Sequence, residues 1–196
     1  MKDRRTSENP VAHLRRLPPE PHLCRERRAL TEEEARLLVK KTEQGARRFG
    51  MTGPHRALAY RFALGTGLRG EEMRSLRWAS FNLEARSSSV TVEASFSKHK
   101  RRDVLPLAEH SVDALLEWKF EHPGGGLVFP LPARTADMLR LDLEDAGISY
   151  RDGAGRVCDW HALRHTFIST IASGGVHPKV AQTLARHSTI SLTMDR

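Results

Sequence analysis

Cysteine and long apolar stretches are both scarce in this chain of 196 residues. The two cysteines, Cys24 and Cys158, lie far apart and form no CxxC pair, which excludes a disulfide framework and a zinc ribbon. No stretch approaches the roughly eighteen uncharged apolar residues of a membrane span, and the polar residues 1–10 lack the apolar centre of a signal peptide. These absences predict a cytoplasmic protein with no membrane partner.

Aromatic and acidic residues are also few. Aromatic residues make up 6% of the chain, and Tyr60 and Tyr150 are its two tyrosines. Lys and Arg outnumber Asp and Glu by 32 to 24, so the net charge is +8, which suits a polyanionic partner such as nucleic acid. The net charge on its own does not distinguish a nucleic-acid-binding protein from a basic protein that binds only counter-ions. The hydrophobic content of 39% is enough for the core of one ordinary domain.

The distribution of proline divides the chain in two. Residues 1–29 contain Pro10, Pro18, Pro19 and Pro21 among many basic residues, and they carry too few apolar residues to build a core. This segment is predicted to be a basic linker, and residues 30–196 a single compact domain.

Helix signals recur through that domain. Thr31 followed by three glutamates predicts a helix to about Arg48, and Pro54 opens a second that the glycines at 65 and 67 end. A third begins at Glu71. Apolar spacing predicts four more helices, at 110–120, 135–143, 160–172 and 178–186.

Strand signals are confined to one stretch. Residues 89–93 alternate between polar and apolar, 103–107 form a second extended run, and the basic residues 98–102 are predicted to be the turn between them. The predicted fold is therefore mainly α with a small antiparallel β-sheet, an α+β domain.

Four short stretches carry the chemistry: 66–73 (TGLRGEEM), 97–107 (SKHKRRDVLPL), 161–165 (HALRH) and 184–190 (LARHSTI). Arg69 lies between two glycines at a helix start, where it could bind an anion or, alternatively, pair with Glu71 or Glu72. His161 and Arg164 lie three apart on one helix and are therefore adjacent, either as a solvated pair or as phosphate ligands.

Together and in this order, the four stretches resemble the catalytic domain of the tyrosine recombinases, also called phage-type integrases, over roughly residues 25–196. The resemblance implies that the side chains that hold the scissile phosphate are Arg69, His161, Arg164 and His187. It implies that Lys98 is the general acid toward the leaving 5′ oxygen and that Glu72 steadies the pocket from behind. It also implies that no metal or other cofactor is needed, and that residues 1–29 are the remnant of a link to a preceding DNA-clamping domain.

Some positions leave alternatives open. Lys100 competes with Lys98 for the general-acid role, and the run Lys100, Arg101 and Arg102 is otherwise predicted to meet DNA phosphates. Arg186 stands where the family usually has glycine, which leaves the local turn undecided, and His187 could instead be a structural C-cap. His165 matches no catalytic position and is predicted to pack or cap.

The nucleophile is the missing part. The family places its tyrosine nine or ten residues after the histidine that matches His187, but position 196 is an arginine. The expectation is that this version of the chain is truncated before that tyrosine and is inactive for cleavage; a natural arginine at the position is the alternative.

The resulting hypothesis is a site-specific DNA recombinase that cleaves and rejoins double-stranded DNA through a 3′-phosphotyrosyl intermediate. The resemblance implies a homotetramer in the synaptic complex, whereas this chain alone is expected to be monomeric. A type IB topoisomerase-like enzyme and a non-enzymatic DNA-binding module, with residues 174–195 as two short helices around a turn, are the competing hypotheses.

Overall fold

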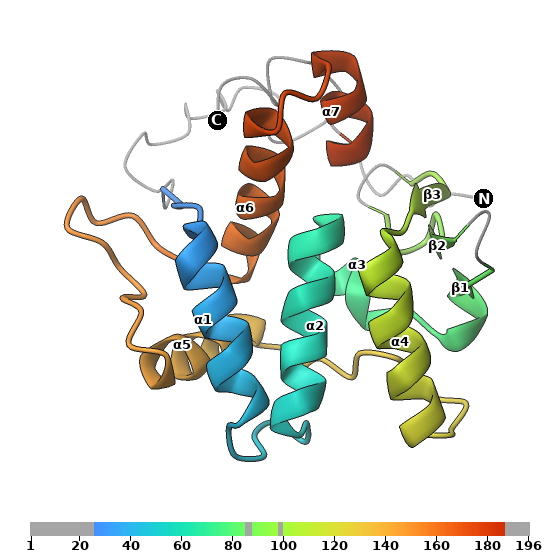
Figure 1. Ribbon diagram of the computed structural model, residues 1–196, viewed down its shortest axis with the longest axis horizontal. Coiled ribbons are helices and arrows are strands. Elements are labelled where there is room, and N and C mark those ends of the chain that lie inside the picture. Colours follow the sequence, from blue (N-terminus) through green and yellow to red (C-terminus); the bar gives the residue numbers. More distant parts are fainter. Residues whose placement is uncertain (1–25, 85–87, 98–99, 187–196) are drawn as a thin grey trace, which may run out of the picture.

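The computed structural model describes residues 26–84, 88–97 and 100–186 (Figure 1). Seven α-helices, one short 3₁₀ helix and a three-stranded antiparallel sheet make up this part of the chain, which confirms the predicted α+β class. The helices are α1 (Glu32–Glu43), α2 (Gly53–Thr66), α3 (Gly70–Arg74), α4 (Glu109–Glu121), α5 (Thr135–Asp145), α6 (Trp160–Ser173) and α7 (Pro178–Ala185), and the strands are β1 (Phe81–Asn82), β2 (Ser89–Val92) and β3 (Asp103–Pro106).

Helix α1 begins where predicted and ends earlier. The Thr31 hydroxyl accepts from the Glu34 backbone N–H, and the Glu34 carboxylate accepts from the Thr31 N–H, so both ends of a capping box are present. The predicted continuation to Arg48 is wrong, because Gly45 turns the chain and lets Gly53 approach. A Cβ on Gly53 would lie 2.4 Å from the Gly45 carbonyl oxygen, so glycine is required where α2 meets the end of α1.

Helix α2 ends at Gly67, not at Gly65, which lies inside the helix. Gly67 has a left-handed φ of 62°, and its N–H donates to the Ala63 carbonyl. A Cβ on Gly67 would lie 2.4 Å from Cδ1 of Phe167, so the absence of a side chain also lets α6 approach this turn. The turn therefore sets Arg69, two residues later, beside α6.

The sheet has the predicted hairpin and one unpredicted strand. Strands β2 and β3 pair antiparallel, with Val90 opposite Leu105 and Val92 opposite Asp103. Strand β1 pairs with β2 on its other side but has two residues, too few to show an alternating pattern. The connection between β2 and β3 carries the basic run.

The core surrounds α2. Helices α1 and α4 flank α2, and α6 lies across its end near Gly67 (Figure 1). On α6, Trp160, Leu163, Phe167 and Ile171 form an apolar stripe, of which the first three residues are buried. The remaining α6 stripe residue, Ile171, packs on a smaller cluster shared with α7. Helix α6 thus joins the core to the end of α7.

A charged network is also buried inside the core. The Arg56 guanidinium donates to both carboxylate oxygens of Asp142, at 2.8 and 3.0 Å, and the Tyr60 hydroxyl donates to the same carboxylate at 2.7 Å. All three residues are fully buried. Burial, then the Asp142 charge and hydrogen bond, raises the pKa of Tyr60 well above its ordinary value.

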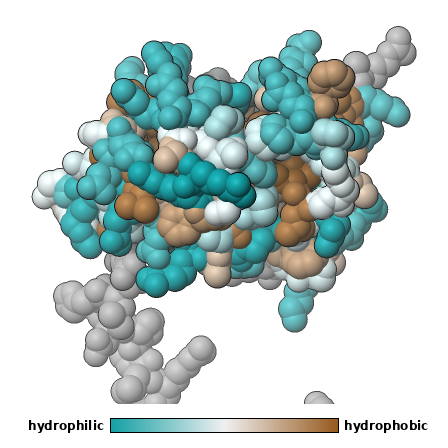
Figure 2. All heavy atoms as spheres, turned by 90° about the horizontal axis from the view of Figure 1, so that it is seen from below, coloured by the Kyte–Doolittle hydropathy of each residue, from teal (hydrophilic) through white to brown (hydrophobic). Residues whose placement is uncertain are grey.

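The face seen from below in Figure 1 carries hydrophilic residues with apolar patches among them (Figure 2). Helix α4 ends on this side, and Phe120 near its end is 88% exposed.

Within residues 26–84, 88–97 and 100–186, no helix is both long and apolar enough to cross a membrane. Cys158 is buried and unpaired, and burial raises the pKa of its thiol to about 12.

Candidate functional site

Arg69 stands at the N-cap of α3, as its position between two glycines predicts. Its guanidinium donates to Oε1 of Glu72 at 3.0 Å, and its backbone N–H donates to Oε2 of the same residue at 2.8 Å. The Glu72 carboxylate therefore takes up the backbone N–H of Arg69, which is not available to an external anion. The Arg69 side chain is 22% exposed, so its guanidinium can still meet a ligand.

His161 and Arg164 lie side by side at the start of α6. Asp159 caps this helix, because its carboxylate accepts from the backbone N–H groups of His161 and Ala162. Arg27 donates to both oxygens of the Asp159 carboxylate at 2.9 Å. The segment before α1 thus braces the helix start that carries His161, a contact that no sequence pattern indicated.

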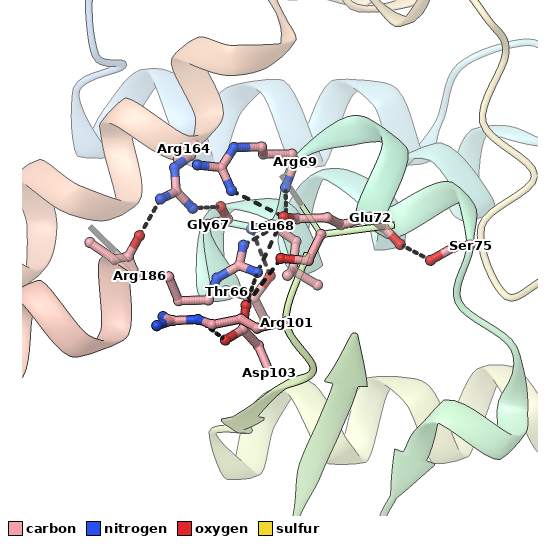
Figure 3. Close-up of polar contacts among 12 residues, drawn as sticks. Thr66, Gly67, Leu68, Arg69, Glu72, Ser75, Arg101, Asp103, Arg164 and Arg186 are labelled. Carbon is pink, nitrogen blue, oxygen red and sulfur yellow. Dashed lines mark hydrogen bonds and ion pairs between the residues drawn. The ribbon is translucent and has the colours of Figure 1, made fainter. Parts of the chain in front are cut away.

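Arg164 is 2% exposed and holds two backbone turns together (Figure 3). One end of its guanidinium donates to the Gly67 carbonyl at 2.7 Å, and the other donates to the Ala185 carbonyl at the end of α7. The guanidinium therefore lies between the Arg69 turn and the residue next to Arg186.

His161 is neutral in this structure at physiological pH. Burial lowers the pKa of its imidazole to about 4, and the positive charges of Arg27 and Arg164 add to the effect. A neutral imidazole can donate one hydrogen bond to a phosphate. The low pKa favours this donor role over proton shuttling near neutral pH. The ring of His165 contacts that of His161 edge-on at 5.4 Å between centroids, which agrees with the packing predicted for His165.

Arg186 enters the site from the end of α7, and in the sequence this position stands out only because the family usually has glycine there. Its guanidinium donates to both oxygens of Glu72, at 2.5 and 3.2 Å, and lies 3.4 Å from the Asp103 carboxylate (Figure 3). Arg186 is 4% exposed. Its backbone has a left-handed φ of 52°, so the turn has the conformation that glycine would favour.

Glu72 is fully buried between Arg69 and Arg186, which agrees with the bracing role predicted for it. Burial raises the pKa of its carboxyl, but the hydrogen bonds and charges of Arg186 and Arg69 outweigh that effect. The pKa therefore lies below its ordinary value, and the residue is ionised at neutral pH.

Two of the five predicted catalytic residues, the general acid Lys98 and the phosphate ligand His187, fall outside the residues that the structure describes. Each directly follows a described residue, because Ser97 lines the cleft and Arg186 is buried against Glu72. Lys100, Arg101 and Arg102 are exposed, as expected of residues that meet DNA. Arg101 pairs with Asp103 at 3.0 Å and Arg102 lies 3.5 Å from Glu93, and the two arginine side chains stay 61% and 65% exposed.

A cleft of ≈ 480 Å³ opens beside Arg69. Its lining includes Arg69, Glu72, Ser97, Asp159, Trp160 and His161. The structure thus brings Arg69 and His161 to one cleft, with Arg164 adjoining both through Gly67 and α6. Among the described residues, no group of three His, Cys, Asp or Glu side chains is placed to hold a metal ion. The arrangement is suited to an anion of phosphate size.

Comparison with known sequences decides the family. Residues 28–195 match the sequence model of the phage integrase family. The chain belongs to this family. Tyrosine recombinase XerC of Xanthomonas campestris pv. campestris (strain B100) is 28% identical over 131 residues, which are 65% of this chain and 39% of XerC. The family match and this relative confirm the resemblance to tyrosine recombinases. The integrase chain spans about two fifths of the length of such curated relatives.

Solved structures confirm the catalytic-domain fold. The catalytic domain of bacteriophage HP1 integrase superposes with a TM-score of 0.64 at 23% identity, covering 87% of this chain and 86% of that domain. The Tn1549 transposon integrase in complex with circular intermediate DNA superposes with a TM-score of 0.61 at 19% identity, covering 85% of this chain and 61% of that one. The predicted tyrosine-recombinase catalytic-domain fold is therefore confirmed.

The low pKa of His161 predicts a pH dependence of anion binding. In the empty site the imidazole is neutral above about pH 4. A bound sulfate dianion, which keeps its charge across this range, should favour the protonated ring and raise its pKa. Binding then takes up a proton, and the sulfate affinity of the integrase should increase as pH falls from 7.5 to 5. Titration of the His161 ring signals by NMR, with and without sulfate, measures both pKa values.

The variant His161→Gln is the control for this prediction, because it keeps a hydrogen-bond donor and cannot titrate. Its sulfate affinity should change less with pH than that of the unmodified chain. An affinity that rises equally in both proteins would assign the proton uptake to another group.

Proposed function

We propose that this integrase chain binds the scissile phosphate of double-stranded DNA and carries out strand cleavage and rejoining in site-specific recombination. The observation that supports the proposal most strongly is that Arg69 and His161, from the starts of α3 and α6, line one cleft, with Arg164 bonded to the nearby Gly67 carbonyl and the buried Glu72 carboxylate behind Arg69. The DNA in the Tn1549 integrase complex supports the choice of partner.

The proposed reaction is a transesterification. A tyrosine hydroxyl attacks the phosphorus, the bond to the 5′ oxygen breaks, and a 3′-phosphotyrosyl link forms. Arg69 and Arg164 stabilise the negative charge that develops on the phosphate oxygens, with His161 and His187 as further donors. The tyrosine loses its hydroxyl proton as it attacks, and Lys98 delivers a proton to the departing 5′ oxygen, so the protons balance. A 5′ hydroxyl from another strand reverses the step, so the cycle consumes no cofactor.

Tyr60 is unsuited to be the nucleophile. Its hydroxyl is fully buried, donates to Asp142 at 2.7 Å and has a raised pKa, so the phenolate that attacks is strongly disfavoured. Tyr150 is half-buried against the core, with the Arg140 guanidinium 4.9 Å from its ring centroid. We therefore propose that the nucleophile is neither of these two tyrosines. We also propose that the working assembly is a synaptic homotetramer.

The test supplies the nucleophile at the position that the family pattern predicts. The 196-residue chain is compared with versions continued by one tyrosine, or by one phenylalanine, after Arg196. Each is incubated with a pool of nicked duplexes whose sequence is randomised around the nick, so that a cleaved strand end diffuses away and the covalent adduct accumulates. We expect an adduct with the tyrosine version alone, detected as a DNA-dependent mass shift on denaturing gels.

The result also separates the competing functions. A tyrosine version that binds the duplexes but forms no adduct would overturn the cleavage proposal and favour a non-enzymatic DNA-binding module. An adduct on Tyr60 or Tyr150 of the unextended chain would overturn the choice of nucleophile. Relaxation of supercoiled plasmid without strand exchange would instead favour a type IB topoisomerase-like activity.

A further inference from the structure

The backbone at Arg186 has a conformation that costs energy for any residue except glycine. Arg186 has φ 52° and ψ 40°, and its N–H donates to carbonyls in the last turn of α7. Among the described residues, Phe49 and Lys100 are the other non-glycine residues with positive φ, and both are exposed. Arg186 alone of these three is buried. A strained and buried arginine indicates that its side chain contributes something that glycine cannot.

The side chain joins three parts of the site. Its guanidinium contacts Glu72 on α3 through two hydrogen bonds and Asp103 on β3 through one. The side chains of Glu72 and Asp103 are 1% and 11% exposed. Strand β3 follows the basic turn that carries Lys98, and His187 is the next residue after Arg186. One guanidinium therefore ties the end of α7 to α3 and to the hairpin (Figure 3).

The electrostatic consequence concerns Arg69. Glu72 accepts hydrogen bonds from Arg69 and from Arg186, so its negative charge is shared between two cations. Asp103 also pairs with Arg101, at 3.0 Å, so its charge is compensated even without Arg186. The Glu72 carboxylate accepts from the guanidinium groups of Arg69 and Arg186, so without Arg186 one of these two cations would face it instead of both. Arg69 would then be the main counter-ion of Glu72.

We propose that Arg186 is a positioning residue that neutralises Glu72, so that the Arg69 guanidinium can bind a phosphate group. The proposal rests on the proposed function, because it assigns Arg186 a role in that same pocket. Arg186 acts through Glu72 and Arg69 and has no direct contact with the substrate. The bidentate geometry requires the planar fork of arginine, which lysine lacks.

The test measures the affinity of the 196-residue chain for sulfate, by NMR shifts of the pocket residues. Arg186→Gly removes the cation and relieves the backbone strain, and it should weaken sulfate binding about tenfold, the effect of one lost charge-assisted interaction. Arg186→Lys keeps the charge without the fork and should weaken binding by a smaller factor, about threefold. Thermal unfolding of each variant confirms that the domain is folded.

The decisive variant is the double substitution Arg186→Gly with Glu72→Gln. If Arg186 acts by neutralising Glu72, removal of the Glu72 charge should restore sulfate affinity to within about threefold of the unmodified chain, because Arg69 no longer has a competing carboxylate. A purely structural role for Arg186 predicts that the double variant binds as weakly as Arg186→Gly or more weakly. That outcome, or an unchanged affinity in Arg186→Gly, would overturn the inference.

The variant Arg69→Ala separates this inference from the proposed function. An unmodified chain that binds no sulfate, or binds it equally well without Arg69, would overturn the phosphate pocket itself and the role of Arg186 with it. Sulfate binding that depends on Arg69 and is unaffected by Arg186→Gly would overturn only the role of Arg186.

Discussion

Replacing Asp142 with asparagine is expected to lower the free energy of unfolding by about 3–5 kcal/mol, the usual cost of breaking a buried ion pair from one side. Asparagine has nearly the same shape but no charge, so Arg56 would remain fully buried with no counter-ion at its Nε and Nη2 groups. The Tyr60 hydroxyl would also lose its charged acceptor. Urea denaturation followed by circular dichroism measures the change.

The matched control is Asp137→Asn in the same helix, α5. Asp137 pairs with Arg134 at 2.9 Å, but the side chains are 37% and 83% exposed. An exposed pair of this kind contributes less than about 1 kcal/mol. Similar losses in the two variants would contradict the importance of burial for the Asp142 network.

Replacing Arg69 with alanine should slow formation of the covalent DNA adduct roughly 10²–10³-fold, the typical effect of losing one transition-state donor. Arg69 lines the cleft, and Glu72 holds its guanidinium from behind. The measurement is the single-turnover rate of adduct formation by the chain continued with tyrosine, on the nicked duplex that the randomised pool selects. Lysine at position 69 should recover part of the rate, because it restores the charge but cannot donate from a fork.

The control for this prediction is Arg36→Ala, which removes an arginine that is 75% exposed on α1 and pairs with Glu32. Its adduct rate should stay within about twofold of the unmodified rate. A comparable loss at both positions would point to a general effect of net charge, and an unaffected Arg69→Ala variant would remove Arg69 from the transition state.

Local sequence signals predicted the helix starts well, because each depends on a few adjacent residues. The capping hydroxyl of Thr31 and the early prolines Pro54 and Pro178 lie where the structure begins α1, α2 and α7. The end of α1 was misplaced because it depends on a contact with Gly53, which no local pattern shows. Strand β1 was missed because two residues carry no periodicity.

Only the residues of the candidate site that belong to the family motifs could be predicted from the sequence. Arg69, Glu72, His161 and Arg164 were identified from their spacing and resemblance, and the structure places them around one cleft or directly behind it. The motif pattern could not reveal the contacts of Arg186, since it marks that position only as a departure from glycine. The signal that could have indicated them was an acidic residue, Asp103, directly after the basic run 98–102.

The Arg27 contact with Asp159 was equally hidden. It joins residues 132 positions apart, and Arg27 lies in a segment whose proline and basic residues predicted a linker. Residues 26–29 in fact pack against the domain, because the Glu26 carbonyl accepts from the Val157 N–H and Arg28 pairs with Glu34. Composition describes the average character of a segment and cannot show which of its residues dock.

The long separation of the contacts around Arg164 and Arg186 has a consequence for folding. Arg164 meets Gly67 across 97 positions, and Arg186 meets Asp103 and Glu72 across 83 and 114 positions. Contacts that close such long loops carry a large entropic cost and depend on nearly the whole domain being folded. A partly folded chain therefore has scattered charges but no assembled pocket, so the proposed phosphate site forms only when folding is complete.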